Sequence, residues 1–367
     1  MLELARPLAE RAATGRPLAV ATVVGIDGSA PRAVGATMFV DADGSVVGSL
    51  SGGCVEGAVV EACHAVLEGA DPAVVRYGIS DEAAMGVGLM CGGDLDVYIE
   101  RLPAGDRPVL EAARDGAEAS VGTIVGGPRQ LIGARVADLT DAQLRDSGAD
   151  GVTADRIRAE HEAHARAGRS VAWRAQCGQV ELTVFTDVAL VAPRLLIFGA
   201  VDFSAALADV GRLLGYHVTV CDARAMFATP ERFPGAHEVV RAWPHVYLGE
   251  TAVDERTVVC VLTHDLKFDV PLLTLALELP VAYVGAMGSR RTHERRIRAL
   301  REHGVPESAL SRLHSPIGLD IGASTPAETA VSILAEVIAV RGGASGRSLS
   351  GTEGPIHRSN QSVGVAG

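Results

Sequence analysis

Two short stretches in the first hundred residues combine a cysteine with paired glycines. They are Gly52-Gly53-Cys54 and Cys91-Gly92-Gly93. Paired glycines let a ligand approach the backbone closely, because no Cβ stands in the way. The hydrophobic pattern predicts that a helix begins near Cys54, where unpaired N–H groups stabilise an anion or a thiolate. We interpret both stretches as candidate cofactor contacts, with Cys54 and Cys91 as candidate ligands of a soft metal.

The alternative for each stretch is a tight turn beside a small buried thiol. The six cysteines are scattered, and no histidine lies at the spacing of a zinc site. The sequence therefore excludes a classical zinc centre here but leaves the choice between ligand and turn open.

Polar residues also follow three apolar runs in the last third of the chain. His264 and Asp265 follow the first run, Gly288-Ser289-Arg290 follows the second, and Asp320 lies beyond the third. In open α/β sheets ligands bind outside the carboxyl ends of the strands, so we expect these residues to meet at one site. Gly-Ser-Arg at the start of a helix suits an anion, and a capping or salt-bridge role is the alternative for each residue alone.

A third motif begins like a dinucleotide-binding turn and then departs from it. An apolar strand runs into Gly199, but Val201 stands where such turns have the glycine that admits a pyrophosphate. The acidic residue expected about 20 positions later is present as Asp222. We therefore expect a Rossmann-like scaffold with another duty and do not expect NAD(P) to bind.

The elements that must position these residues change character near residue 194. Before it we predict strands, a hairpin over 36–50, a helix over 55–67, a second hairpin over 122–136 and a helix from Thr153. After it, short apolar runs alternate with helices, as in a parallel sheet, and the last helix opens with the capping box Thr325-Pro326-Ala327-Glu328.

The predicted fold class is α/β, an N-terminal α+β module followed by a Rossmann-like parallel module. We place the first module at 1–190, a linker at 191–194, the Rossmann-like domain at 195–341 and a disordered Gly/Ser-rich tail at 342–367.

Composition narrows the class of partner. The 367 residues carry a net charge of −12 and no basic run, which argues against nucleic acid. No apolar stretch reaches the roughly 18 residues of a membrane span, and the start has no apolar signal core. We expect a cytoplasmic protein with reduced thiols, without a membrane or nucleic-acid partner.

At this point the sequence resembles a known family. The stretches "DGSAPRAVGATMFVDADGSVVGSLSGGCVEGAVVEA" and "CGGDLDVYIE" are similar to the N-terminal module of the XdhC/CoxI family. The stretches "LTHDLKFDVPLL", "YVGAMGSRRTHERR" and "SPIGLDIGASTPAETAVSILAEVIA" resemble its Rossmann module. One departure stands out, because Gly199-Ala200-Val201-Asp202 replaces the Gly-x-Gly-His that the family often has.

The resemblance implies an accessory protein and chaperone of molybdenum hydroxylases such as xanthine dehydrogenase or CO dehydrogenase, more than an enzyme. Such a protein binds the molybdenum cofactor (molybdopterin, in mono- or dinucleotide form), holds it during sulfuration and delivers it to the apo-enzyme. A cysteine desulfurase is the partner that supplies the sulfur. The recipient dehydrogenase, the cofactor form and a homo-oligomeric state stay open.

Two other functions remain as alternatives. One is an NAD(P)-dependent oxidoreductase with His264 or Asp265 as the acid–base group, favoured by Asp222 and opposed by Val201. The other is a scaffold that bridges desulfurase and dehydrogenase without holding a cofactor.

Overall fold

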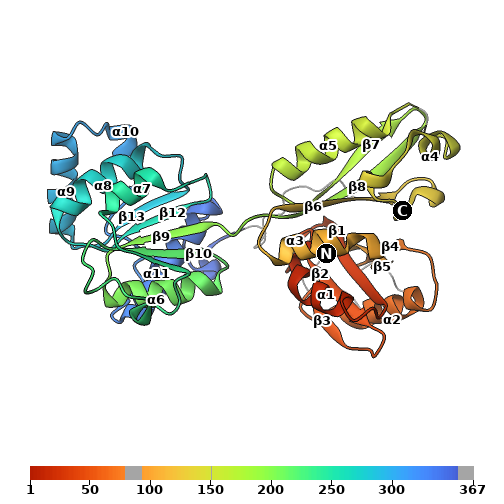
Figure 1. Ribbon diagram of the computed structural model, residues 1–367, viewed down its shortest axis with the longest axis horizontal. Coiled ribbons are helices and arrows are strands. Elements are labelled where there is room, and N and C mark those ends of the chain that lie inside the picture. The colour runs from red at the N-terminus through yellow and green to blue at the C-terminus, as the bar shows by residue number, and fades with distance from the viewer. Residues whose placement is uncertain (79–92, 150, 354–367) are drawn as a thin grey trace. The chain divides into compact units, whose positions relative to one another are not determined.

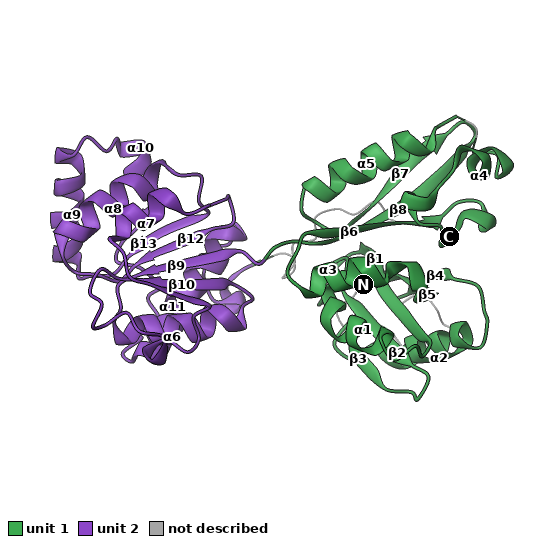
Figure 2. Cartoon of the chain, in the orientation of Figure 1, with its two compact units in different colours: residues 1–191, 353–367 green, residues 192–352 purple. Residues whose placement is uncertain are grey.

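The computed structural model describes residues 1–78, 93–149 and 151–353. They divide into two compact units, which we call unit 1 (chiefly residues 1–191) and unit 2 (residues 192–352) (Figures 1 and 2). Each unit mixes helices with strands, and unit 2 contains a parallel sheet, so the predicted α/β class is confirmed. No helix within the described ranges is long and apolar enough to cross a membrane.

Unit 1 begins with an antiparallel five-stranded sheet in the order β3-β2-β1-β5-β4. Its central strand β1 is buried on both faces. Ala19, Ala21 and Val23 pack with the helix α2, whereas Leu18 and Val20 pack with α1 and α3. The elements are α1 (Ala5–Ala12), β1 (Leu18–Asp27), β2 (Thr37–Asp41), β3 (Val46–Gly48), α2 (Glu56–Leu67), β4 (Ala73–Tyr77), β5 (Asp94–Arg101) and α3 (Arg107–Arg114).

The rest of unit 1 is a three-stranded antiparallel sheet in the order β6-β8-β7. Its elements are β6 (Ala119–Gly126), α4 (Asp141–Asp146), α5 (Ala154–Arg166), β7 (Val171–Cys177) and β8 (Val180–Ala189). Thr153 caps α5 by accepting a hydrogen bond from the Arg156 N–H, as predicted. The hairpin predicted over 122–136 is wrong. After β6 the chain turns at Gly127-Pro128 into 3-10 turns, because proline lacks a ladder N–H, and β6 pairs with β8 instead.

Unit 2 is a six-stranded parallel sheet in the order β11-β10-β9-β12-β13-β14 (Figure 1). Its strands are β9 (Arg194–Phe198), β10 (His217–Cys221), β11 (Glu238–Val240), β12 (Val258–Val261), β13 (Tyr283–Ala286) and β14 (Leu313–His314). Its helices are α6 (Asp202–Leu213), α7 (Pro244–Glu250), α8 (Leu266–Glu278), α9 (Arg290–Glu302), α10 (Glu307–Leu310) and α11 (Pro326–Arg341). This strand order is that of a Rossmann fold.

Both faces of this sheet are buried, which explains its continuous apolar strands. Leu195 and Ile197 of β9 join a core under α6 and α11, while Leu196 and Phe198 join a core under α7 and α8 (Figure 1). The predicted capping box is present at Thr325, and α11 ends at Arg341 as expected. The two helical layers leave the carboxyl edge of the sheet uncovered by either layer's core.

Candidate functional site

The loops that follow the strands of unit 2 meet at the carboxyl edge of the sheet. The strand order reverses between β9 and β12, and ligands of such sheets bind outside the strand ends at this point. Gly199 follows β9 with a φ of +115°, and an added Cβ there would lie 3.0 Å from the Thr263 nitrogen after β12. Glycine is therefore required for the two loops to pack together.

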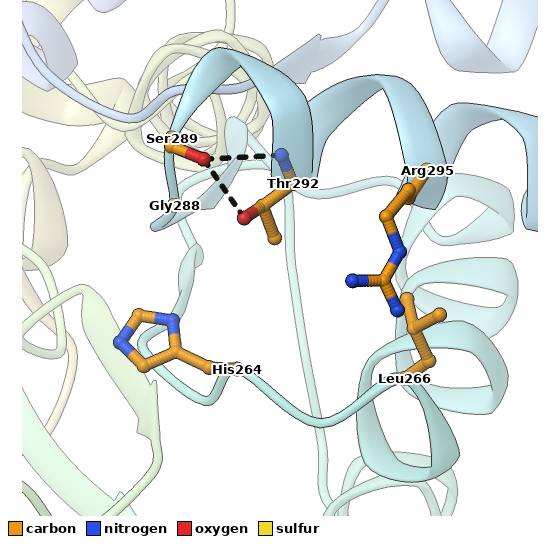
Figure 3. Close-up of a pocket in the computed structure, with 6 residues that line it drawn as sticks. All are labelled: His264, Leu266, Gly288, Ser289, Thr292 and Arg295. Carbon is orange, nitrogen blue, oxygen red and sulfur yellow. Dashed lines mark hydrogen bonds between the residues drawn. The ribbon is translucent and has the colours of Figure 1, made fainter.

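A pocket of about 230 Å³ opens at this edge (Figure 3). Figure 3 shows side chains from the β12–α8 loop and from the start of α9 around one open space. Three residues predicted from the sequence meet there, since His264, Gly288 and Ser289 all line the pocket. The sequence analysis did not single out the other lining residues, which are Leu266, Thr292 and Arg295.

The pocket has the chemistry of an anion site. Ser289 is the N-cap of α9, and its Oγ accepts a hydrogen bond from the Thr292 N–H at 3.2 Å. The amino-terminal end of this helix of 13 residues carries a partial positive charge. Arg295 adds a guanidinium, and His264 adds a ring nitrogen that can donate. Its positive charges and donors favour a phosphate or carboxylate group.

A buried ion pair lies behind the pocket and joins its loops. Arg296 is fully buried and donates to the Asp269 carboxylate at 2.7 Å and to the Met287 carbonyl at 2.9 Å. It also donates to Ser315 Oγ at 3.2 Å, and Thr263 donates to the other oxygen of Asp269. One arginine therefore ties together the segments that follow β12, β13 and β14. Its only signal in the sequence was the arginine-rich run of α9, which looks like an exposed helix face.

The remaining predicted residues of this edge lie outside the six that line the pocket. Asp265 caps α8 by accepting from the Lys267 N–H at 3.1 Å, and this bond holds the pKa of Asp265 below its usual range. Arg290 is exposed on the first turn of α9, and Asp320 is exposed in the segment between β14 and α11. These three residues therefore surround the edge without lining the pocket.

The broken fingerprint is closed by contacts within the chain. Asp222 is buried and accepts hydrogen bonds from the Ala200 N–H at 2.7 Å and from the Arg224 side chain, also at 2.7 Å. Burial by itself raises the pKa of Asp222, but Arg224 and the Ala200 N–H lower it further, so the carboxylate stays charged. Val201 packs with the core beneath α6. The carboxylate that would hold a ribose is thus already engaged by Ala200 and Arg224.

In unit 1 the glycine loop before α2 wraps around a carboxylate of its own helix. Glu56 accepts hydrogen bonds from the N–H groups of Ser51, Gly52 and Gly53 at 2.8, 3.0 and 2.9 Å. The Ser49 and Ser51 hydroxyls add two more, each at 2.7 Å. The anion-binding geometry predicted at Gly52-Gly53-Cys54 therefore exists, and Glu56 fills it. The sequence reasoning missed Glu56 because a glutamate in a first helical turn is common.

Replacing Glu56 with glutamine is expected to lower the free energy of unfolding by about 1–2 kcal/mol, because the amide presents N–H to backbone donors. Burial raises the pKa of Glu56, but the Ser51 and Ser49 donors outweigh it and the net pKa is lowered from 4.5. Its stabilisation is thus present above about pH 4.5 and is lost as pH falls. Urea unfolding at pH 7 and pH 3 measures it, and a gap between wild type and Glu56→Gln that widens at pH 3 would contradict this account.

The two predicted thiol sites differ in how far the structure reaches them. Cys54 is half-buried against the core under α2, next to the exposed glycines. Cys91 and Gly92 lie outside the described residues, so their predicted roles stay predictions. Gly93 packs against the chain itself, since an added Cβ would lie 2.4 Å from the Ser29 carbonyl oxygen. In the part of the chain that the structure describes, no group of three His, Cys, Asp or Glu residues is placed to hold a metal.

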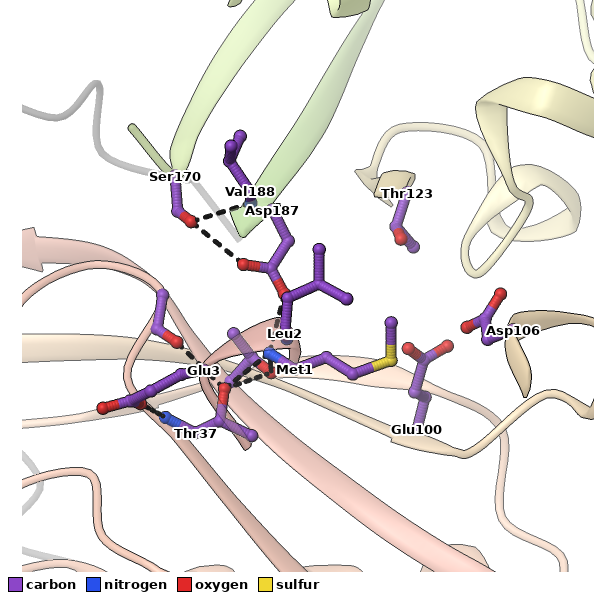
Figure 4. A network of polar contacts seen from close by, with 12 residues as sticks. Met1, Leu2, Glu3, Thr37, Glu100, Asp106, Thr123, Ser170, Asp187 and Val188 are labelled. Atoms are coloured by element: carbon purple, nitrogen blue, oxygen red, sulfur yellow. Dashed lines mark hydrogen bonds and ion pairs between the residues drawn. The ribbon is translucent and has the colours of Figure 1, made fainter. Parts of the chain in front are cut away.

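A second buried polar network lies in unit 1 (Figure 4). Asp187 accepts from the Leu2 N–H at 2.8 Å and from the Ser170 hydroxyl at 2.9 Å. Nearby, Arg135 donates to Glu100 at 2.8 Å and to Asp106 at 2.5 Å, and all three side chains are at most 10% exposed. These contacts join the two sheets of unit 1, and we assign them a structural role.

Comparison with known proteins identifies both units. Residues 11–78 match the model of the XdhC and CoxI family, and residues 195–337 match that of the XdhC Rossmann domain. A crystal structure described as a xanthine dehydrogenase from Bacillus halodurans superposes with a TM-score of 0.68. It is 25% identical and the match covers 96% of this chain and 97% of that one.

Two curated relatives align over most of the chain. A Bacillus subtilis protein, named as one of the probable subunits of xanthine dehydrogenase, is 28% identical over 324 residues, which are 88% of this chain and 92% of the relative. The Escherichia coli protein named "Molybdenum cofactor insertion chaperone PaoD" is 27% identical over 329 residues, 89% of this chain and 85% of the relative. With matches in both units and the strand order of a Rossmann fold in unit 2, the chain belongs to the XdhC/CoxI family, as its sequence motifs predicted.

Proposed function

We propose that the protein binds the molybdenum cofactor and delivers it to the apo-form of a molybdenum hydroxylase. The observation that carries this proposal is the match to both family domains together with a relative named as a molybdenum cofactor insertion chaperone. Two further relatives carry xanthine dehydrogenase in their names, which supports an enzyme of that type as the recipient.

The pocket of unit 2 supports the phosphate end of this cargo. Its volume of about 230 Å³ lies below the roughly 300–1,000 Å³ of pockets that enclose a whole drug-sized ligand. It therefore suits one charged group of the cofactor better than the entire molecule. Arg295 and the amino-terminal end of α9 would neutralise the phosphate, and His264 would donate a hydrogen bond.

The thiol of Cys54 is the described group suited to a soft metal centre. It stands beside Gly52 and Gly53, where an added Cβ would meet nothing within 4 Å, so a ligand can reach this backbone. We propose that Cys54, together with Cys91, contacts the cofactor near molybdenum while a cysteine desulfurase supplies sulfur. The protein then acts as a holder of the cofactor during sulfuration, and its own side chains need not catalyse the transfer.

The direct test is to purify the protein from cells that make the cofactor and to measure released pterin and bound molybdenum. We expect both in similar amounts, and we expect a deletion strain to contain an inactive molybdenum hydroxylase. Absence of pterin above background, together with an active hydroxylase in the deletion strain, overturns the proposal. Micromolar binding of NAD(P)H without pterin would point to the oxidoreductase alternative instead.

Cys54→Ala is expected to lower the molybdenum retained by the purified protein at least about tenfold, as loss of a metal contact does. Cys63→Ala is the matched control. Cys63 is fully buried in α2, and burial raises its pKa to about 12, so its thiol stays protonated and cannot act as a thiolate ligand. Metal analysis by mass spectrometry measures both, and Cys91→Ala is expected to resemble Cys54→Ala. Equal retention in Cys54→Ala and Cys63→Ala would remove Cys54 from the site.

A further inference from the structure

The pocket of unit 2 is too small for a whole cofactor, so most of any ligand that enters it must rest on a neighbouring surface. The first turn of α8 connects the pocket to such a surface. Leu266 lines the pocket, and Phe268 stands two residues farther along the same helix. Two residues of α-helix rise about 3 Å, so the two side chains belong to one local surface.

Phe268 forms a ring pair with an exposed tryptophan. The rings of Trp243 and Phe268 lie 5.2 Å apart at 43°. Trp243 caps α7 and is 52% exposed, although the other tryptophan of the chain, Trp173, is buried. A large apolar ring left in solvent costs free energy, and here it stands at the carboxyl edge of the sheet, just beyond the end of β11.

The charges around this ring pair are mixed but mostly engaged. The Lys267 ammonium lies 4.8 Å from the centre of the Phe268 ring and 3.1 Å from the Asp265 carboxylate. Asp265 in turn caps α8, and Arg224 attracts it from the segment after β10. The adjoining pocket adds Arg295 and His264. An apolar ring face beside a basic pocket is complementary to a flat ring that carries a phosphate.

We propose that this surface and the pocket form one composite site for a flat heteroaromatic ring joined to a phosphate. The phosphate enters the pocket at Ser289 and Arg295, and the ring stacks on Trp243. Both a nucleoside monophosphate and a phosphorylated pterin have this chemistry. The inference rests on the proposed function for the identity of the natural ligand, and it deepens that function by assigning the ring contact.

The test uses Trp243 as its own reporter in the full-length Trp173→Phe variant, where it is the single tryptophan. We expect GMP, CMP or a phosphorylated 6-hydroxymethylpterin to quench its fluorescence to saturation, because stacking quenches an exposed indole. Quenching by the nucleotides assigns the ring as a nucleobase, and quenching by the pterin alone assigns it as the pterin. Absence of saturable quenching by all three up to millimolar concentration overturns the proposal.

Variants then separate the two ends of the site by calorimetry. Trp243→Ala is expected to weaken binding about tenfold, as loss of one base–aromatic stack does, while Trp243→Phe restores most of it. Arg295→Ala should weaken GMP but leave guanosine unchanged. Leu213→Ala, on an exposed leucine of α6, is the matched control and should bind as wild type. Equal affinity of Trp243→Ala and Leu213→Ala rejects the ring contact.

These outcomes are distinguishable from failure of the proposed function. Saturable ring binding in a protein that carries no pterin or molybdenum from cells would overturn the chaperone role and leave the composite site standing. Retained cofactor without any effect of Trp243→Ala on retention or on nucleotide binding would overturn the composite site alone.

Discussion

Arg296→Met is expected to lower the free energy of unfolding of unit 2 by about 3–5 kcal/mol, as removal of one partner from a buried ion pair does. The Asp269 carboxylate has no exposed surface and would keep only the Thr263 hydroxyl as a partner in this network. The loops that Arg296 joins at Met287 and Ser315 would also lose their common donor. Urea titration followed by circular dichroism measures the change.

Arg298→Met is the matched control for this prediction. Arg298 lies two residues farther on the same helix and is exposed, so its replacement should change stability by about 0.5 kcal/mol or less. The double variant Asp269→Asn/Arg296→Met should recover part of the loss, because it removes the unpaired buried charge. If Arg296→Met unfolds like Arg298→Met, the pair does not hold the loops behind the pocket.

Arg135→Met is expected to destabilise unit 1 by a similar amount, about 3–5 kcal/mol at neutral pH. The substitution leaves Glu100 and Asp106 buried without their cation; Figure 4 labels both carboxylates together with Thr123. Arg135 also donates to the Thr123 hydroxyl at 2.8 Å, and that bond is lost as well. The fluorescence of Trp173, which is buried in unit 1, reports the unfolding of this unit.

The pH dependence gives this prediction a second readout. Burial already raises the pKa of Glu100, and Arg135 opposes that rise. Without Arg135 the folded-state pKa rises further above the unfolded value. A group of this kind contributes stability below its unfolded pKa and loses it as pH increases. The deficit of Arg135→Met should therefore be smaller at pH 5 than at pH 8.

Arg129→Met controls for the loss of an arginine from the same segment. Arg129 is 86% exposed and pairs with Asp71 at the surface, where such pairs contribute about 0–1 kcal/mol. A deficit of Arg135→Met that is equal at both pH values, or no larger than that of Arg129→Met, would show that the buried carboxylates do not depend on this cation.

Much of the fold followed from local patterns. The apolar strands of unit 2, the capping box at Thr325 and the helix that follows Thr153 are all present as predicted, because each depends on residues within one turn or one strand. The hairpin over 122–136 failed for the opposite reason. Its partner strand β8 lies about 60 residues away, and no local pattern states that distance.

The candidate site shows the same division. His264, Gly288 and Ser289 could be placed at one edge from the sequence, since each follows a strand of a parallel sheet. The sequence alone thus determined the family, the two kinds of sheet and the edge at which a ligand would bind.

Only the tertiary structure decided which polar groups are still available to a ligand there. Arg296 meets Asp269 across 27 positions, and Asp222 meets Ala200 across 22. Glu56 fills the loop that paired glycines seemed to leave open. In each case a charged side chain is used up by a backbone or partner that folding brings to it. Such partners are set by the packing of whole loops, and the spacing of residues along the chain does not encode them.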